Sequence, residues 1–364
     1  MKRWLFLIGS LLIVLTTNSA DARRTHLTAD QKAKLEKVQT IFVSVLALTE
    51  KGQVDSGSIA GLVKSKLEQI KYTVVTDAKA PHDVEFRVKC EERKTWTGTT
   101  ASGGDAELVD APSRLWKGPA CLFSYSLNGN DLGWYKEVRT SFEDSIQAAK
   151  AAQADDPGVY AIRQLEIRVK EYDFPVMITA EWGQVDRLLS LLDSTNTNKV
   201  RKVKILSELS ELNAEVALPR LTKIMEDKDL QQEAITALAG TGPESIPLLI
   251  DLFQTSRQDA IRAAAAKALG DVAARSGDPR TIPPLVDYLK TALTKMETSE
   301  DINFPVLTEV VWSIGKLRDE RSIAPMAQLQ KKIWLIFDNS EQMANLREAA
   351  NWSYKQLDLD GHIS

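Results

Sequence analysis

The chain has few of the residues that most often carry chemistry. Its 364 residues include only two cysteines and three histidines. His26, His82 and His362 are far apart in the sequence, so no two have the spacing of a metal-binding helix face. The sequence also contains no P-loop and no nucleophile elbow. We therefore expect no catalytic residue, no metal and no cofactor.

An excess of basic charge is also missing. The chain has 46 basic and 50 acidic side chains, and residues 180–364 carry 22 basic against 27 acidic ones. Proteins that bind nucleic acid along a solenoid depend on a basic stripe. The charge balance therefore disfavours nucleic acid as a partner. With 43% hydrophobic residues and no low-complexity tract, the chain is long enough for two domains, each with its own core.

Residues 1–22 have the pattern of an export signal. Lys2 and Arg3 precede the apolar run Trp4–Leu15, and Ala20–Ala22 offers a small-residue cleavage site. The run is about twelve residues long, shorter than the roughly 20 that span a bilayer, which favours cleavage over an uncleaved membrane anchor. We expect a mature protein from Arg23 with no stable membrane span, exported to the bacterial periplasm or out of the cell.

Residues 23–175 have the pattern of an α+β domain with an antiparallel-rich sheet. Residues 41–48 are apolar on both faces, which predicts a central strand covered on both sides. Asn128-Gly129 predicts a tight turn. The order of elements resembles the sheet-plus-helix modules of some bacterial envelope proteins, such as the N-terminal domain of the TolB-type proteins. The patterns predict helices at 29–38, 58–70, 141–154 and 157–172, and strands at 41–48, 72–76, 83–91, 120–127 and 132–140.

The two cysteines fall on strands that we expect to be neighbours. Cys90 ends one strand on its apolar face, and Cys121 begins the next strand on its own apolar face. If these strands pair antiparallel, the cysteines lie opposite each other, with Cα atoms about 4.5–5.5 Å apart. That spacing suits a disulfide, and an oxidising compartment favours its formation. We predict a Cys90–Cys121 disulfide. Two buried free thiols are the alternative.

The connection between the cysteine strands, residues 95–119, is long for a hairpin and is bracketed by Trp96 and Trp116. Loops of this length are usually functional or disordered. The two tryptophans make this segment a candidate interaction loop, because exposed tryptophans can anchor a protein partner. Alternatively, they fold back and cover the sheet.

A sequence motif, called the repeated phrase below, recurs within residues 180–360. Residues 238–249, 276–285 and 317–326 each end one helical pattern, pass through a polar turn and start a second helix that has a proline in its first turn. A proline is tolerated there because the first-turn amide has no acceptor within the helix. Such a helical pair cannot bury its apolar face alone, so it must stack on neighbouring pairs. The prolines that open these helices are Pro219, Pro247, Pro283 and Pro325.

The motifs of this region resemble the HEAT repeat, most closely the short version of phycobilisome-lyase-like proteins. Ala265, Ala268 and Leu269 form an Ala-x-x-Ala-Leu-Gly helix end, and SGDPRTIPPL follows as the turn. The resemblance implies a right-handed α-solenoid of four to five helical pairs, with the second helix of each pair lining the concave face. Families with this repeat include chromophore lyases, but most members are protein-binding scaffolds. In this region the only histidine is His362 and cysteine is absent, so chromophore chemistry has no residue to depend on.

From these patterns we expect an exported, non-enzymatic scaffold or adaptor that binds a protein partner through the solenoid. The α+β domain would orient that partner or bind a second one. The alternative is a small-molecule-binding or enzymatic protein with a site between the two domains. A purely structural role in the cell envelope is a third possibility.

Overall fold

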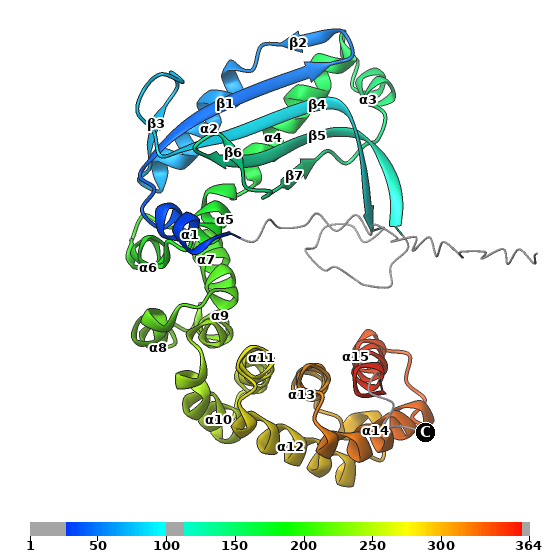
Figure 1. Ribbon diagram of the computed structural model, residues 1–364. Coiled ribbons are helices and arrows are strands. Elements are labelled where there is room, and N and C mark those ends of the chain that lie inside the picture. Colours follow the sequence, from blue (N-terminus) through cyan, green and yellow to red (C-terminus); the bar gives the residue numbers. More distant parts are fainter. Residues whose placement is uncertain (1–26, 100–112, 359–364) are drawn as a thin grey trace, which may run out of the picture. The chain divides into compact units, whose positions relative to one another are not determined.

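The computed structural model describes residues 27–99 and 113–358, and Figure 1 shows their arrangement. The predicted signal sequence, His26 and His362 lie outside these residues. The described chain forms two compact units: unit 1 contains residues 27–31 and 38–172, and unit 2 contains residues 32–37 together with the described chain from Asp173 onward. The short helix that holds residues 32–35 is α1 (Ala29–Leu35). None of the described helices is long and apolar enough to cross a membrane.

Unit 1 is a mixed sheet with helices packed on it. Its described strands are β1 (Thr40–Thr49), β2 (Gly52–Val54), β3 (Thr73–Val75), β4 (Val84–Thr99), β5 (Ser113–Leu127), β6 (Asn130–Asp131) and β7 (Lys136–Arg139). The strand order is β2-β1-β4-β5-β6, with β3 also paired to β1 and β7 to β5. β1 runs parallel to β3 and β4, and the other pairings are antiparallel. The helices of the unit are α2 (Gly57–Gln69), α3 (Ser145–Ala151) and α4 (Pro157–Glu171).

The prediction that β1 is covered on both faces is wrong. The helices that pack on the sheet, α2 and α4, lie on one side of it (Figure 1). Ile41 and Val43 are buried on that side, whereas Phe42 between them is only half-buried. The neighbouring strand β4 explains the difference, because its alternate residues Arg87 and Lys89 are charged and need water. One face of the sheet is therefore the core of unit 1.

Two local predictions have different outcomes. The Asn128-Gly129 turn is confirmed, since both residues have the positive φ angles (52° and 78°) of a two-residue hairpin turn. The helix predicted at 141–154 is shorter, because α3 begins only at Ser145. The reason is the capping residue: the Asp144 side chain accepts hydrogen bonds from the amides of Ile146 and Gln147. With this start, Ile146 points outward and is 49% exposed.

Unit 2 is a run of helical pairs. In Figure 1 the second helix of each pair forms the inner row of an arc, and the first helix forms the outer row. After α5 (Phe174–Glu181), the outer helices are α6 (Val185–Asp193), α8 (Leu218–Ile224), α10 (Ile246–Thr255), α12 (Ile282–Lys295) and α14 (Ile323–Leu335). The inner helices are α7 (Lys199–Glu211), α9 (Gln231–Ala237), α11 (Asp259–Ser276), α13 (Phe304–Leu317) and α15 (Glu341–Asp358).

The prolines of the repeated phrase stand where the sequence predicts them. Pro219, Pro247 and Pro283 are each the second residue of an outer helix, and Pro325 is the third residue of α14. Most of the apolar residues that flank them enter the core of unit 2. Those that are fully buried include Leu221, Ile246, Leu249, Leu285 and Met326.

Glycine and serine bring the inner helices together. The Ser313 hydroxyl of α13 donates to the Ala266 carbonyl of α11 (2.9 Å), and the site of contact on α11 is Gly270. A Cβ atom at Gly270 would lie 2.8 Å from the Ser313 Cα, which is too close for any side chain. The next contact repeats this arrangement, with Gly315 of α13 against Ser353 of α15. These adjacent inner helices therefore pack so closely that only glycine is tolerated at the point of contact.

Candidate interaction surface

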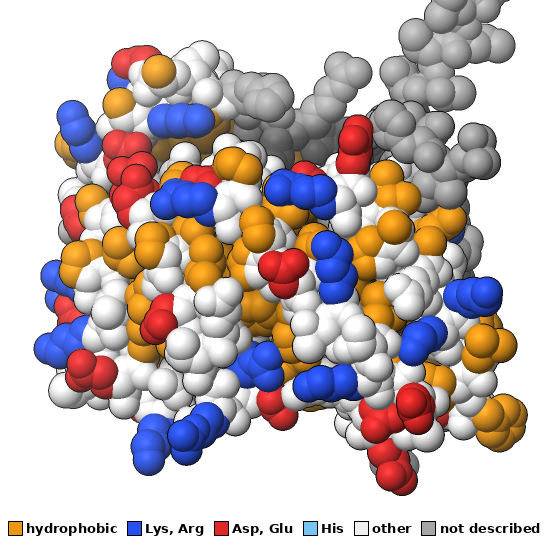
Figure 2. All heavy atoms as spheres, turned by 90° about the horizontal axis from the view of Figure 1, so that it is seen from below, with side chains coloured by type: hydrophobic (Ala, Val, Ile, Leu, Met, Phe, Trp, Pro, Cys, Tyr) orange, Lys and Arg blue, Asp and Glu red, His pale blue; other side chains and the backbone are white. Residues whose placement is uncertain are grey.

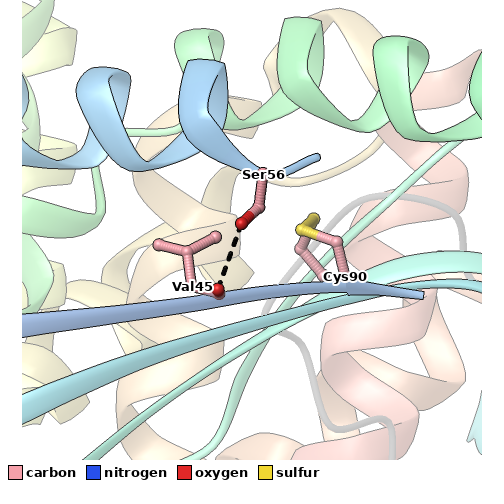
Figure 3. The surroundings of a disulfide bond; sticks show 4 residues. Val45, Ser56 and Cys90 are labelled. Atoms are coloured by element: carbon pink, nitrogen blue, oxygen red, sulfur yellow. Dashed lines mark hydrogen bonds between the residues drawn. A yellow bond between two sulfur atoms is a disulfide. The ribbon is translucent and has the colours of Figure 1, made fainter. Parts of the chain in front are cut away.

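The predicted disulfide is present in unit 1. Cys90 on β4 and Cys121 on β5 are directly opposed in the strand register, with their Cα atoms 3.9 Å apart. Both are fully buried. Figure 3 shows the Cys90 sulfur on the same side of the sheet as α2, where the Ser56 hydroxyl donates to the Val45 carbonyl (3.2 Å). The disulfide therefore joins two central strands within the core and is a structural element of the unit.

The two candidate tryptophans do not lie on a loop. β4 continues to Thr99 and β5 begins at Ser113, so strands occupy both ends of the expected 95–119 connection. After a register shift between Glu91 and Lys94, Trp96 is the direct partner of Trp116 across the ladder. Threonine and tryptophan favour strands, which explains the extension. Residues 100–112 lie outside the described chain, and a role in binding stays a prediction.

In unit 2, the inner helix α13 leaves one arc of its surface uncovered. Thr308, Glu309, Trp312 and Lys316 are half-buried on this arc, while the remaining residues in the middle of the helix are buried. The burial comes from α11, α12 and α15, which pack around the other sides of the helix. These four residues, with Lys267 of α11 and Trp352 of α15, are called the inner surface below.

Two tryptophans form the centre of the inner surface. The rings of Trp312 and Trp352 have their centroids 5.0 Å apart at an angle of 51°, and both side chains are half-buried. Each tryptophan is followed by a serine, Ser313 or Ser353, that hydrogen-bonds to the preceding inner helix. The two therefore occupy the same position in successive repeats. The corresponding signal in the sequence is the recurring Trp-Ser dipeptide, which lies outside the alanine, leucine and proline positions of the repeat.

Glu309 lies one turn before Trp312 on the same arc. Burial raises the pKa of the Glu309 carboxyl above its usual value, and the charges of Lys267 and Lys316 act in the opposite direction without cancelling the shift. Lys316 donates to Asp271 (2.5 Å) rather than to Glu309. Among the described residues, none donates a hydrogen bond to the Glu309 carboxylate. The inner surface therefore carries a partly desolvated charge without a direct protein partner, which costs free energy in the unbound state.

An aromatic pair beside an unpaired carboxylate is suited to binding protein side chains. Half-buried tryptophans supply large apolar contact area at low entropy cost, and a carboxylate can accept from a lysine, an arginine or a backbone amide. In the described parts of the chain, no group of three or more histidine, cysteine, aspartate or glutamate residues could hold a metal ion.

Comparison with known proteins identifies the class of unit 2. Residues 218–296 match the family model of HEAT repeats, and the chain therefore contains HEAT repeats. Among solved structures, the chain is similar to the complex of CpcE and CpcF of phycocyanin lyase from Nostoc sp. PCC7120, with 19% identity and a TM-score of 0.34. That match covers 46% of this chain and 98% of the other. A search of curated proteins returned no match.

Proposed function

We propose that the protein is an exported, non-enzymatic adaptor of the bacterial periplasm or extracellular space, and that it holds a protein partner on the inner surface of unit 2. HEAT repeats support this proposal, because stacked helical pairs generate extended surfaces that bind other proteins. Unit 1 would orient the partner or bind a second one. The export part of the proposal is supported by the pattern of residues 1–22 and by the disulfide, which suits an oxidising compartment.

The Trp312–Trp352 pair beside Glu309 is the observation that carries the proposal. Tryptophans are enriched among the few residues that dominate the free energy of protein–protein binding. A charge that is already partly desolvated loses little further hydration when a partner covers it, and it gains a hydrogen bond. Both features favour a bound partner over free solvent.

The test is capture of a partner by the tagged full chain, followed by measurement of its affinity for the variants. We expect W312A/W352A to weaken binding of the identified partner by at least about tenfold, since loss of an interface tryptophan commonly costs 2 kcal/mol or more. The matched control is W334A, which removes a tryptophan that is 59% exposed on the outer helix α14.

Circular dichroism and thermal unfolding establish that the variants remain folded. Equal binding by W312A/W352A and by the unaltered chain would contradict the proposal. So would loss of binding in W334A alone, which would place the partner on the outer side of unit 2.

A further inference from the structure

A pocket of about 450 Å³ lies in unit 2 at the end of α10 and along α12, outside the inner surface. Figure 2 views unit 2 from its outer side and shows hydrophobic side chains in furrows between charged ones. The apolar walls of the pocket include Phe253, Met296 and Leu307, which are each at most 2% exposed. The volume falls in the range of small-molecule sites.

Arg262 supplies a cation to this pocket. Its guanidinium lies 5.1 Å from the centroid of the Tyr288 ring, and its Nε donates to the Phe253 carbonyl (3.1 Å). The contact with Asp259 is long, at 3.9 Å, so it is an ion pair without a hydrogen bond. The terminal N–H groups of the guanidinium are therefore available to a ligand.

Two further donors line the same pocket from α12. Tyr288 and Lys295 are seven residues apart, two helical turns, and so lie on one face of the helix. Burial raises the pKa of Tyr288, so its hydroxyl stays protonated at neutral pH and can donate. In the described chain, neither the Tyr288 hydroxyl nor the Lys295 ammonium has a hydrogen-bond partner.

The acidic residues of the lining do not satisfy these donors. Asp301 accepts from the amides of Glu297 and Thr298 and from the Thr298 hydroxyl, so its carboxylate is already occupied. Asp287 is exposed at the rim. The pocket thus combines apolar walls with three groups that can donate to a ligand: the terminal N–H groups of Arg262, the Tyr288 hydroxyl and the Lys295 ammonium.

We propose that this pocket binds a carboxylate that carries an aromatic or branched aliphatic group. The carboxylate accepts hydrogen bonds from Arg262, Tyr288 and Lys295, because charge-assisted bonds to carboxylates are the strongest these donors can make. The apolar group contacts Phe253 and Met296. A free organic acid and the C-terminal residue of a polypeptide both have this chemistry.

The experiment uses the full chain with ¹³C-methyl-labelled methionine, so that the Met296 methyl reports on the pocket by NMR. The probes are 4-phenylbutyrate, its amide, and the peptide Gly-Gly-Phe with a free or an amidated C-terminus. We expect at least one free acid to move the Met296 signal and to saturate, with the matching amide at least about tenfold weaker. The tighter of the two acids identifies the source of the ligand.

Variants test the assignment of the donors. Y288F removes only a hydroxyl without a protein partner, so the fold is retained, and we expect binding to weaken about threefold to tenfold. K295Q has a similar effect. A292F fills the pocket and abolishes binding of the acid, whereas R257Q, which alters an exposed arginine outside the lining, leaves the affinity unchanged.

Three results would overturn the proposal: no probe moves the Met296 signal, acid and amide bind equally well, or A292F still binds the acid. The proposal for the pocket and the proposal for the inner surface can be refuted independently. We expect A292F still to capture the protein partner and W312A/W352A still to bind the acid. Each experiment therefore tests only one of the two sites.

Discussion

At the scale of single residues, Glu309 shows how a candidate binding residue can oppose stability. Its pKa is raised because burial penalises the charged carboxylate. The folded state therefore binds the proton more tightly than the unfolded state does. Stability is then highest below the unfolded pKa of about 4.3 and falls as the pH rises through the higher folded value.

We predict that E309Q raises the thermal midpoint of unit 2 at pH 7, because it removes the ionised carboxylate. The gain should shrink as the pH falls through the raised folded pKa of Glu309 and vanish below about 4, where Glu309 is neutral in both states. Thermal unfolding of both chains between pH 3.5 and 7.5 measures this. A lower midpoint for E309Q at pH 7 would mean that the carboxylate stabilises the fold and is not held ready for a partner.

Close packing between α11 and α13 requires a glycine at position 270. G270A places a Cβ atom 2.3 Å from the Ser313 hydroxyl and 2.8 Å from its Cα, so α13 must move. We expect a loss of about 1–3 kcal/mol in the free energy of unfolding, typical of overpacking. The control is G61A in α2, where the added Cβ meets nothing within 4 Å and a gain of up to about 1 kcal/mol follows from helix propensity. Urea unfolding measures both, and equal effects would contradict the packing argument.

The core positions of the repeats were predictable from the sequence, but the candidate binding residues were not. Alanine, leucine and proline recur at fixed offsets because close packing and turn chemistry leave few alternatives, so Ala265 and Pro283 could be assigned from the pattern. Trp312 and Glu309 occupy the uncovered arc, where the repeat imposes no residue type. What they contact depends on the spacing of α13 and α15, which one sequence does not give.

At the scale of elements, a cationic side chain caps the C-terminus of three outer helices in unit 2. The helix dipole and the unpaired last carbonyls both favour a cation there. Arg347 makes the fullest set of bonds and lies 5.3 Å from the centre of the Trp334 ring. The donors and their acceptors are Arg262 with Phe253, Lys332 with Leu293 and Met296, and Arg347 with Ile333, Ile336 and Asp338.

We predict that R347M lowers the free energy of unfolding by about 2 kcal/mol, because three carbonyls lose a charged donor. R347K should lose less, since an ammonium keeps the charge but cannot reach all three acceptors. R257M, which alters an exposed arginine, should change stability by less than about 0.5 kcal/mol. Chemical denaturation compares the three, and an R347M value within that limit would contradict a capping role.

The β4–β5 ladder is the corresponding element of unit 1. Cys90 and Cys121 are 31 residues apart, so their link restricts the unfolded chain by about 3–4 kcal/mol on the loop-entropy account. We predict that C90A/C121A lowers the stability of unit 1 by roughly that amount. Unfolding with and without reductant measures it, and mass spectrometry of unreduced protein checks the pairing. Two free thiols in native protein would contradict the link.

The same ladder marks where element prediction failed. Alternation identified the strands that carry the cysteines, because one face of each is buried. Beyond Glu91 the strand register shifts, and the alternation of apolar and polar residues no longer predicts a strand. The prediction that β1 is covered on both faces failed for a related reason. Phe42 is apolar, but the charged residues of the neighbouring strand β4 decide whether a helix can pack over that face.

At the scale of the whole molecule, the chain divides after Tyr172. Residues 32–37 belong with unit 2 although they lie between two parts of unit 1 in the sequence, and the Leu35 carbonyl accepts from the Gln184 side-chain amide (2.9 Å). Unit 2 is therefore completed by a segment that a cut at the boundary would remove. The intact chain is for this reason the form in which the partner and the pocket ligand are to be tested.

The most direct test of the adaptor account is site-specific photo-crosslinking in cells. A photoreactive residue is placed at Thr308 on the inner surface in one chain, and at Gln328 on the exposed side of α14 in another. The account predicts a discrete protein adduct from position 308 and none from position 328. An adduct from position 328 alone, or none from either position, would contradict the claim that the inner surface holds a protein partner.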